Sequence, residues 1–549
     1  MYYLKGLPRE YFKKISRTES RARKTDKGDP MKDSQEKIEA DALIIGGGIA
    51  GGTAALTLAD EGALVILATR AKSLQESNTF YAQGGIVYEG KDLVADILAA
   101  GAGVSNPAAA KILASEGPGL VDEILINRLN VPFDADSSGL ERTKEGGHGV
   151  ARIIHCADET GRAIETALAT EILNHPNIEV LLETTAVDLL TPAHHSKNRL
   201  AVYETLTCAG AYLLDQRTGQ VARCFAPQTI LATGGLGQIY QHTTNPEGAR
   251  GDGIAMANRA GARIINLEYI QFHPTAFYRI GAPRYLITEM ARGKGARLVD
   301  QYGNPIMDKY DPKGDLATRD IVARSLYKEM VATRASCVYL DLKSYIKRED
   351  ILKDFPNIRK TLLPYGIDIL EDLVPVVPAA HYSCGGVFAD VETAETTVRN
   401  LFAVGEVACN GLHGANRLAS TSLLEGLVFG RRAAAAILNA PIAPSKMYLN
   451  DILPWENFGN EEDDPSLIAQ DLQNIRAIMW NYVGLERTTR RLARARVELS
   501  HAERLVEQFY QNAAISDSLL GLRNIARTAV LVAEAAWENK TSVGCHYRN

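Results

Sequence analysis

The clearest hydrophobic pattern lies near the start of the chain, where a short apolar run meets a cluster of glycines. Residues 42–45 read Ala-Leu-Ile-Ile, and residues 53–59, after the glycines, have helical spacing of apolar positions. A buried strand, a glycine turn and a helix are typical of a βαβ unit. Apolar runs ending in glycine turns recur at 230–235 and 401–406. Three such segments in this order predict a doubly wound α/β sheet with a ligand at the carboxyl ends of its strands.

The first glycine cluster has the G-x-G-x-x-G spacing, at Gly46, Gly48 and Gly51. Gly46 allows a tight turn, Gly48 lets the backbone approach a pyrophosphate, and Gly51 lets the helix pack on the strand. The motif predicts dinucleotide binding but does not separate NAD from FAD. The acidic residue that usually holds the adenosine ribose is missing after the next strand, where Thr69 offers the nearest hydroxyl.

The end of the third apolar run favours FAD over NAD. It finishes in Gly405-Glu406, and flavin disulfide-reductase-like folds place an acidic residue from their last strand on the ribityl or pyrophosphate region. In such folds the next helix begins beside the isoalloxazine ring, where its positive dipole end suits the anionic reduced flavin.

Composition and charge narrow the class of protein. The 549 residues, 46% hydrophobic and 23% charged, suffice for two or three domains with sizeable cores. A formal net charge of -6 argues against nucleic-acid binding, so an anionic substrate needs a local cationic site. Seven scattered cysteines without a C-x-x-C pair indicate a reducing cytoplasm and no metal site. No apolar run approaches the ~20 residues of a membrane-spanning helix, so we expect no transmembrane segment.

The first 40 residues differ from the rest of the chain, being polar and rich in lysine and arginine. We expect a flexible basic extension, because the apolar core of a secretory signal is missing. A basic start is also compatible with an organelle transit peptide, although the interspersed acidic residues weaken that interpretation.

Five longer segments resemble the flavoprotein subunits of succinate dehydrogenase and fumarate reductase and, within that group, the L-aspartate oxidases. The resemblance extends over nearly the whole chain after residue 40. It implies an FAD-dependent enzyme that oxidises L-aspartate to iminoaspartate, starting NAD biosynthesis, and passes the electrons to dioxygen or fumarate. Quinolinate synthase is then the expected partner that uses the imine. The segments that carry the resemblance are Ser77–Ile86, Gly251–Ala257, Gln271–Thr275, Ala379–Gly386 and Gly411–Ser420.

The same resemblance implies a dicarboxylate site made of His273, Thr288, His381 and Arg417. Guanidinium forks and imidazoles are suited to binding two carboxylates out of water, as succinate or aspartate requires. Two alternatives are purely structural: His273, which precedes a proline, could fix a turn, and Arg417 could pair with an internal acid.

Arg319 matches the active-site arginine of the family. Arg324 is its competitor, but five residues of helix place it on a different face. Arg319 would deliver a proton during fumarate reduction. Because an arginine with a pKa above about 12 is a poor resting base, the direction of transfer during oxidation stays open.

Two residues distinguish subfamilies. Asn78 stands where membrane-bound relatives carry the histidine of a covalent flavin bond, so we expect non-covalent FAD. Glu145, in a loop that resembles one of the aspartate oxidases, is expected to attract the substrate ammonium and to repel an extra negative charge. The alternative is an ordinary solvated glutamate.

The resemblance also implies FAD contacts along the whole nucleotide domain. The expected cofactor-binding residues are Gly46, Gly47, Gly48, Ile49, Ala50, Gly51, Thr69, Asn78, Thr79, Phe80, Tyr81, Ala82, Gln83, Gly84, Gly85, Ala186, Val187, Asp252, Glu406, Ser422 and Leu423.

The expected fold is an α/β, FAD-binding Rossmann-like doubly wound domain, interrupted by an α+β capping domain and followed by a C-terminal three-helix domain. Closure of the cap should assemble the site and exclude water. Met479, Trp480 and Val483 have helical spacing typical of core. The expected boundaries are 1–40 for the extension, 41–269 and 382–437 for the FAD domain, 270–381 for the cap, 438–465 for a linker and 466–549 for the helical domain.

Some positions depart from the family. Val543 and Lys294 stand where the family usually has arginine and glutamate, and the chain ends at Asn549, earlier than expected. Besides an aspartate oxidase, two hypotheses stay open: a soluble fumarate reductase, which would not turn over aspartate, and a flavin-binding protein without catalysis. The retained polar site residues disfavour the latter.

Overall fold

The computed structural model describes residues 37–137, 139–282, 284–440, 451–457 and 459–549. A five-stranded parallel sheet lies at its centre, and the three apolar runs that predicted strands are neighbours in it. The doubly wound fold is thus confirmed. In spatial order the strands are β19 (Leu401–Ala403), β12 (Gln228–Leu231), β2 (Ala42–Ile45), β3 (Val65–Ala68) and β8 (Ile178–Leu181).

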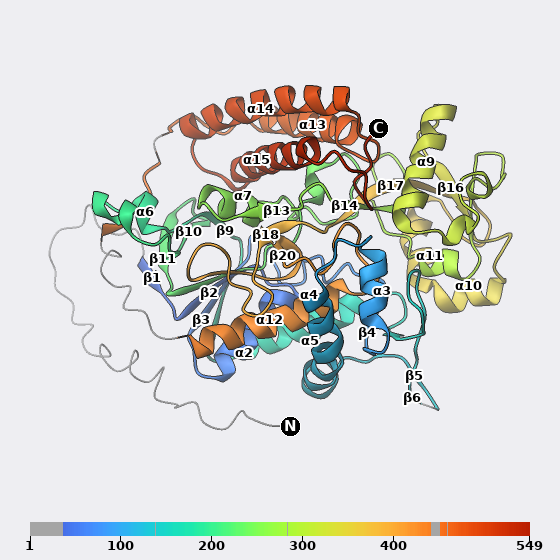
Figure 1. Ribbon diagram of the computed structural model, residues 1–549, viewed down its shortest axis with the longest axis horizontal. Helices are drawn as coiled ribbons and strands as arrows, with labels where there is room; N and C mark the ends of the chain where they lie inside the picture. Colours follow the sequence, from blue (N-terminus) through green and yellow to red (C-terminus); the bar gives the residue numbers. More distant parts are fainter. Residues whose placement is uncertain (1–36, 138, 283, 441–450, 458) are drawn as a thin grey trace.

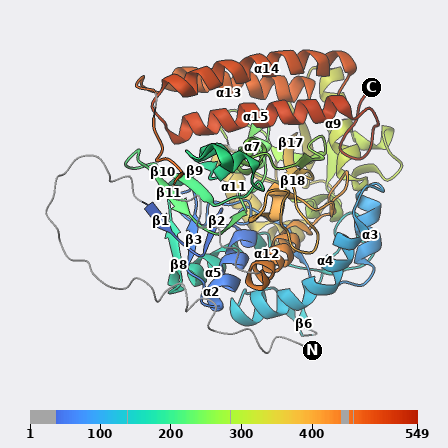
Figure 2. The ribbon, with the colours of Figure 1, turned by 60° about the vertical axis from the view of Figure 1, so that its left-hand side comes forward.

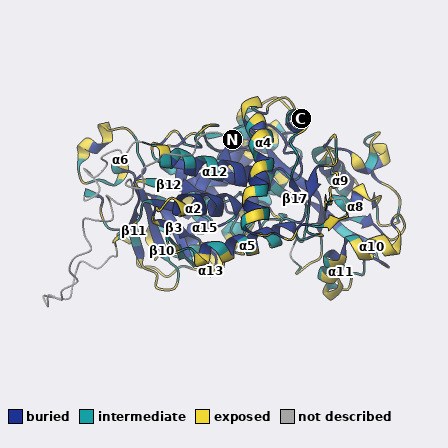
Figure 3. Cartoon of the chain, turned by 90° about the horizontal axis from the view of Figure 1, so that it is seen from below, coloured by how far each residue is buried: buried dark blue, intermediate teal, exposed yellow. Residues whose placement is uncertain are grey.

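Both faces of this sheet are buried at β2, β3 and β19, as expected of strands that are apolar at every position. Ala42 and Ile44 face a layer of helices, whereas Leu43 and Ile45 face a second sheet and the C-terminal helices. Figure 3 shows α4 with one buried and one exposed face, typical of an outer helix. The helical layer consists of α2 (Ile49–Asp60), α3 (Leu93–Ala100), α4 (Pro107–Leu120), a π-helical continuation (Val121–Arg128), α5 (Thr160–Asn174) and α12 (Ser422–Asn439).

The second sheet contains a strand that the sequence did not predict. Residues Lys37–Glu39, assigned to the extension, form β1 and pair in parallel with β11, because the half-buried Ile38 packs against the core. The rest of that extension lies outside the described residues. In spatial order this sheet consists of β1, β11 (Val221–Phe225), β10 (Gly210–Asp215) and β9 (Thr184–Leu189).

Among the described residues, three smaller sheets complete this part of the chain. One has three strands, β13 (Ile264–Ile265), β18 (Gly386–Phe388) and β20 (Ala408–Cys409). The other two are pairs, β4 (Ile86–Val87) with β7 (Ile153–Ile154), and β5 (Ala135–Asp136) with β6 (Gly139–Leu140).

A separate body with its own apolar core stands beside the nucleotide domain, at the right of Figure 1. Its two longest strands belong to an antiparallel sheet and run back into the nucleotide domain, where they carry site residues. The sheet consists of β14 (Ile270–Phe277), β17 (Val374–Ser383), β16 (Val338–Asp341) and β15 (Arg297–Val299), and the helices are α8 (Met290–Gly293), α9 (Arg319–Thr333), α10 (Arg348–Asp354) and α11 (Pro356–Leu362).

Three long helices close the chain and lie side by side over α7 (Asp252–Arg259), as Figures 1 and 2 show. Met479 and Val483 are fully buried and Trp480 packs against the same core, so their structural interpretation is confirmed. No helix in the described part of the chain combines the length and apolar character needed to cross a bilayer. The helices are α13 (Pro465–Tyr482), α14 (Thr489–Asn512) and α15 (Asp517–Glu538); the short α6 (Pro192–His195) lies next to the second sheet.

Candidate active site and cofactor cleft

A long cavity runs from the glycine turn after β2 to the cap. The ends of β2, β3, β12 and β19 all open into it, because the carboxyl ends of parallel strands meet at one edge of the sheet. Its far end is lined by residues of β14, β17 and α9. The cavity therefore joins a nucleotide-type cleft to a polar site under the cap.

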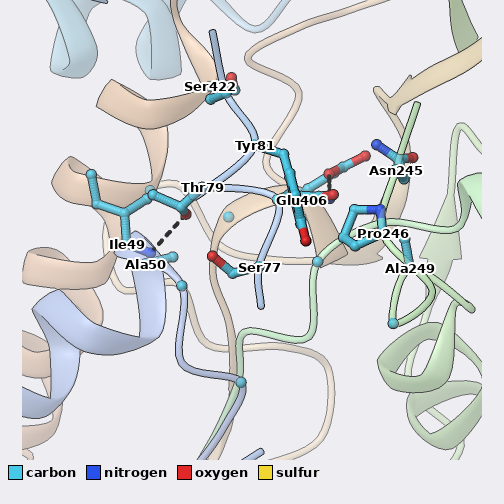
Figure 4. A pocket seen from close by; sticks show the side chains of 18 of the residues that line it. Ile49, Ala50, Ser77, Thr79, Tyr81, Asn245, Pro246, Ala249, Glu406 and Ser422 are labelled. Carbon is cyan, nitrogen blue, oxygen red and sulfur yellow. Dashed lines mark hydrogen bonds between the residues drawn. The ribbon is translucent and has the colours of Figure 1, made fainter. Parts of the chain in front are cut away.

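The glycine turn has the geometry that its spacing predicts. Gly46 has a φ of 112°, and a Cβ on it would lie 2.2 Å from the carbonyl oxygen of Ala232, while a Cβ on Gly51 would lie 2.1 Å from that of Gly46. Gly48 precedes α2 without a side-chain cap, and the Ile49 N–H donates to Thr79 Oγ1 at 3.0 Å (Figure 4). The start of α2 is thus a backbone cradle suited to a pyrophosphate.

The middle of the cavity offers polar groups to a ligand. Gln83 Oε1 and Thr233 Oγ1 are buried without a hydrogen-bond partner among the described residues. Asn78 Nδ2 donates to Glu406 Oε2 at 2.8 Å, and burial raises the pKa of Glu406 to about 7. A long cleft with a glycine cradle and unpartnered polar atoms fits a flavin dinucleotide.

Most residues expected to contact the cofactor line this cavity. Gly51, Phe80 and Val187 are not among its lining residues. Gly51 instead allows the close contact of α2 with the turn, and Phe80 stacks against the Arg162 guanidinium at 5.1 Å. Val187 is fully buried in a core cluster, because neighbouring strand residues face opposite sides and Ala186 takes the side of the cavity.

Two histidines face each other at the cap end. His273 lies on β14 opposite Ala379 of β17, so His381, two residues further, projects on the same side, and the ring centroids are 5.2 Å apart. The His381 Nδ1 bonds the Thr244 hydroxyl at 2.8 Å. Burial and nearby arginine charges lower the pKa of both imidazoles well below the ordinary value, so both are neutral near pH 7.

Two guanidinium groups, a buried one on Arg417 and a largely buried one on Arg319, complete a cationic pocket. Arg417 stacks over the Tyr382 ring at 4.5 Å and donates to Ser422 Oγ at 3.2 Å. Arg319, the first residue of α9, lines the same cavity. The pKa of Arg417 is lowered by its own burial and by the positive charge of Arg319. Thr288, also buried, lies on the wall beside them. Two guanidinium groups in one cavity, the charge of one lowering the pKa of the other, indicate an anionic ligand.

Arg319 has partners that the sequence reasoning missed. Its Nε donates to Glu289 Oε2 at 2.5 Å, and its Nη1 donates to Gln271 Oε1 at 3.3 Å. Burial alone would raise the pKa of Glu289, but the charges of Arg319 and Arg292 lower it to about 2. The sequence contained a signal for both acceptors. Glu289 directly follows Thr288, and Gln271 lies two residues before His273, so in a strand the side chains of Gln271 and His273 point to the same face.

The predicted selectivity residue Glu145 reaches the same cavity. The Ser420 hydroxyl donates to its Oε2 at 2.6 Å, and Ser420 itself has a left-handed backbone (φ 55°). Burial raises the pKa of Glu145, opposed by this hydrogen bond and by the charge of Arg319. A partly buried carboxylate thus stands within a cationic pocket, a combination that suits a ligand with both carboxylates and an ammonium.

Comparison with known proteins fits this geometry. A family model described as FAD binding domain matches residues 41–423. The L-aspartate oxidase of Yersinia pestis is 42% identical over 94% of this chain and 97% of its own length. The chain belongs to the L-aspartate oxidase family. In the same family, the L-aspartate oxidase of Pseudomonas aeruginosa is 40% identical over 93% of this chain and 95% of its own length.

Solved structures place the family among the fumarate reductase and succinate dehydrogenase flavoproteins. A mutant FrdA of the E. coli quinol fumarate reductase has a TM-score of 0.81 at 26% identity, covering 94% of this chain and 92% of its own. Sdh1 of Mycobacterium smegmatis in its apo form has a TM-score of 0.77 at 29% identity, covering 94% and 89%. L-Aspartate oxidases are therefore built on this flavoprotein fold, and FAD is the cofactor.

The departures from the family lie outside the cavity lining. Lys294 pairs with Asp354 at 2.9 Å within the cap, and Val543 packs against the cluster that contains Tyr269 and Tyr382. Arg324 stacks over the Tyr547 ring at 4.4 Å, away from Arg319, as its helical position predicts. In the described ranges, no three His, Cys, Asp or Glu side chains group as metal ligands.

Proposed function

We propose that the protein oxidises L-aspartate to iminoaspartate, with FAD as the electron acceptor. The observation that carries this proposal is the Glu145 carboxylate, which shares one cavity with two arginines and two histidines. A pocket for succinate or fumarate needs only the cations. A carboxylate beside them adds a site for the ammonium that distinguishes aspartate.

The proposed roles of the other residues follow from charge and protonation. Arg417 and Arg319 offer guanidinium donors to the substrate carboxylates, and His273, His381 and Thr288 add neutral donors. Bound between these groups, the substrate cannot rotate, and the cap over it excludes water. Each imidazole can donate only one N–H, so the two rings orient the carboxylates rather than neutralise them.

Proton delivery in fumarate reduction is assigned to Arg319, which Glu289 holds by a hydrogen bond. Bound FAD would supply the acceptor for the hydride that leaves the substrate carbon. In fumarate reduction, the Arg319 guanidinium delivers the proton, and the ionised Glu289, hydrogen-bonded to its Nε, holds the guanidinium in place. In aspartate oxidation the substrate loses a hydride from its Cα and one proton from its ammonium. The Glu145 carboxylate, which holds the ammonium, is placed to accept that proton, and Arg319 with Glu289 stabilises charge.

An anaerobic titration of the flavoprotein tests the proposal. L-Aspartate should bleach the flavin absorbance, whereas D-aspartate should not, and succinate should bleach it far less. Bleaching by succinate alone would instead support the second candidate, a soluble fumarate reductase or succinate dehydrogenase-like flavoprotein, which the structural likeness to FrdA favours. No bleaching by any of the three would leave a flavin-binding protein without catalysis.

Partners and compartment are proposed on chemical grounds. Dioxygen and fumarate are the proposed acceptors of the flavin electrons, and quinolinate synthase is the proposed consumer of the imine, which water hydrolyses if it is not used. All seven cysteines are free thiols, which supports the proposal of a reducing compartment such as the cytoplasm.

We expect FAD to be bound without a covalent bond. The Asn78 amide faces Glu406 and has no nucleophilic ring nitrogen, so it cannot form the histidyl bond of the membrane-bound relatives. Acid or heat precipitation should therefore release yellow FAD into the supernatant, as absorbance at the flavin maximum would show. Flavin that stays with the washed pellet would contradict this prediction.

A further inference from the structure

We infer that His148 and Asp96 are positioning residues that set the place of Glu145 and thereby the preference for an amino-dicarboxylate. The inference rests on the proposed function, because it concerns how the ammonium-binding carboxylate is held. It starts from the turn that carries Glu145, which has little rigidity of its own.

The backbone after Glu145 is unusually permissive. Gly146 and Gly147 follow it, and Gly147 has a φ of 87°. A Cβ on Gly146 would lie 2.5 Å from Glu289 Oε1 and one on Gly147 would lie 2.9 Å from Leu418 Cδ1, so side chains of the site and its surroundings lie close to the turn. A two-glycine turn that must pass this close to the site needs external anchors to stay in one conformation.

His148 provides the first anchor. Its side chain is buried, and this burial lowers the pKa of the imidazole, as does the nearby charge of Arg152. The ring is therefore neutral near pH 7. Its Nε2 lies 3.0 Å from the carbonyl oxygen of Ala419 and must donate to it, since a carbonyl only accepts. Ala419 precedes Ser420, the donor to Glu145, so this bond ties the Glu145 turn to the loop that also carries Arg417.

Asp96, on α3, provides the second anchor. Its Oδ2 accepts from the Gly149 N–H at 2.8 Å and pairs with Arg152 Nη2 at 2.9 Å. The Arg152 side chain is fully buried, so this carboxylate is the charge that makes its burial tolerable. The turn is therefore fixed on one side to the substrate loop and on the other to a helix of the nucleotide domain.

A displaced turn should affect one substrate and spare the other. Aspartate needs Glu145 in hydrogen-bond contact with its ammonium, whereas fumarate has no ammonium and uses only the cationic residues. Small displacements of a binding group lower affinity steeply, because hydrogen bonds weaken within tenths of an ångström. Loss of an anchor should thus raise the KM for L-aspartate and leave fumarate reduction close to its original rate.

The test compares His148→Leu with His148→Gln in the FAD-loaded enzyme. Leucine fills the space without a donor and should raise the KM for L-aspartate about tenfold, while the KM for fumarate and the Ki for succinate change less than about twofold. Glutamine can place an amide N–H near the same carbonyl and should restore most of the affinity. Equal rises for both substrates in the leucine variant, or no rise at all, would overturn the inference.

Asp96→Asn is the second variant, and decides the matter if the leucine variant does not fold. Asparagine can still accept from Gly149 but leaves Arg152 without its counter-charge, so thermal unfolding is recorded beside kinetics. A lower melting temperature with both KM values unchanged would reduce Asp96 to a structural residue. Glu145→Gln is run in parallel, and the flavin-bleaching titration tests the proposed function separately. If Glu145→Gln leaves the KM for aspartate unchanged, Glu145 does not bind the ammonium and the positioning inference fails with it. If Glu145→Gln raises that KM and neither anchor variant does, Glu145 binds the ammonium but His148 and Asp96 do not position it.

Discussion

Arg319→Leu is expected to lower turnover by at least ~100-fold, because it removes both a proton-transfer group and positive charge from the reacting centre. FAD should still bind, since Arg319 belongs to the cap and the glycine cradle is on the opposite end of the cavity. The measurement is steady-state fumarate reduction and L-aspartate oxidation, with flavin content determined in the same preparations.

Arg324→Leu is the matched control, from the same helix. Arg324 stacks over Tyr547 and does not line the cavity, so its loss should leave both activities within a small factor of the original. Near-normal fumarate reduction by Arg319→Leu would instead move the proton-transfer role to Arg292, which is buried beside Glu289.

The fold could be predicted because its signals are local. An apolar strand followed by glycines at fixed spacing specifies a turn on its own, and Gly46 and Gly51 have the close contacts that the spacing implies. Strand β1 was missed for the opposite reason. Residues 37–39 carry two charges and one isoleucine, and only pairing with β11, far away in the sequence, orders them as a strand.

In the site, too, local features could be predicted from the sequence, whereas contacts between distant segments could not. The resemblance indicated which residues form the site, but not their contacts. Glu289 was overlooked because its residue type does not distinguish it from a surface glutamate, and only the fold brings Arg319 and Arg292 into contact with it. The side chain of Val187 faces a core cluster, so the contact that the resemblance implies there stays a prediction for its backbone. One residue along β9 moves a side chain from the cavity to the core.

Glu145→Gln is expected to reduce L-aspartate oxidation about ten- to hundredfold, the effect of about 1.5 to 3 kcal/mol for one charged hydrogen bond. Aspartate differs from succinate chiefly by its ammonium, and glutamine keeps the shape of the side chain while removing its charge. The ammonium also stabilises the ionised form of a carboxyl whose pKa burial raises, so the bound substrate and Glu145 favour each other's charge.

Fumarate reduction decides how the result is interpreted. Fumarate has no ammonium, and removing a negative charge from the pocket should leave its reduction unchanged or improve it. Glu141→Gln is the matched control, because Glu141 belongs to the same segment but is exposed, and it should change neither activity. If both activities of Glu145→Gln fell together, the carboxylate would be supporting the turn or the flavin site instead. If neither changed, Glu145 would not contact the substrate, and the preference for aspartate would have to come from Arg417, the histidines and the shape of the pocket alone.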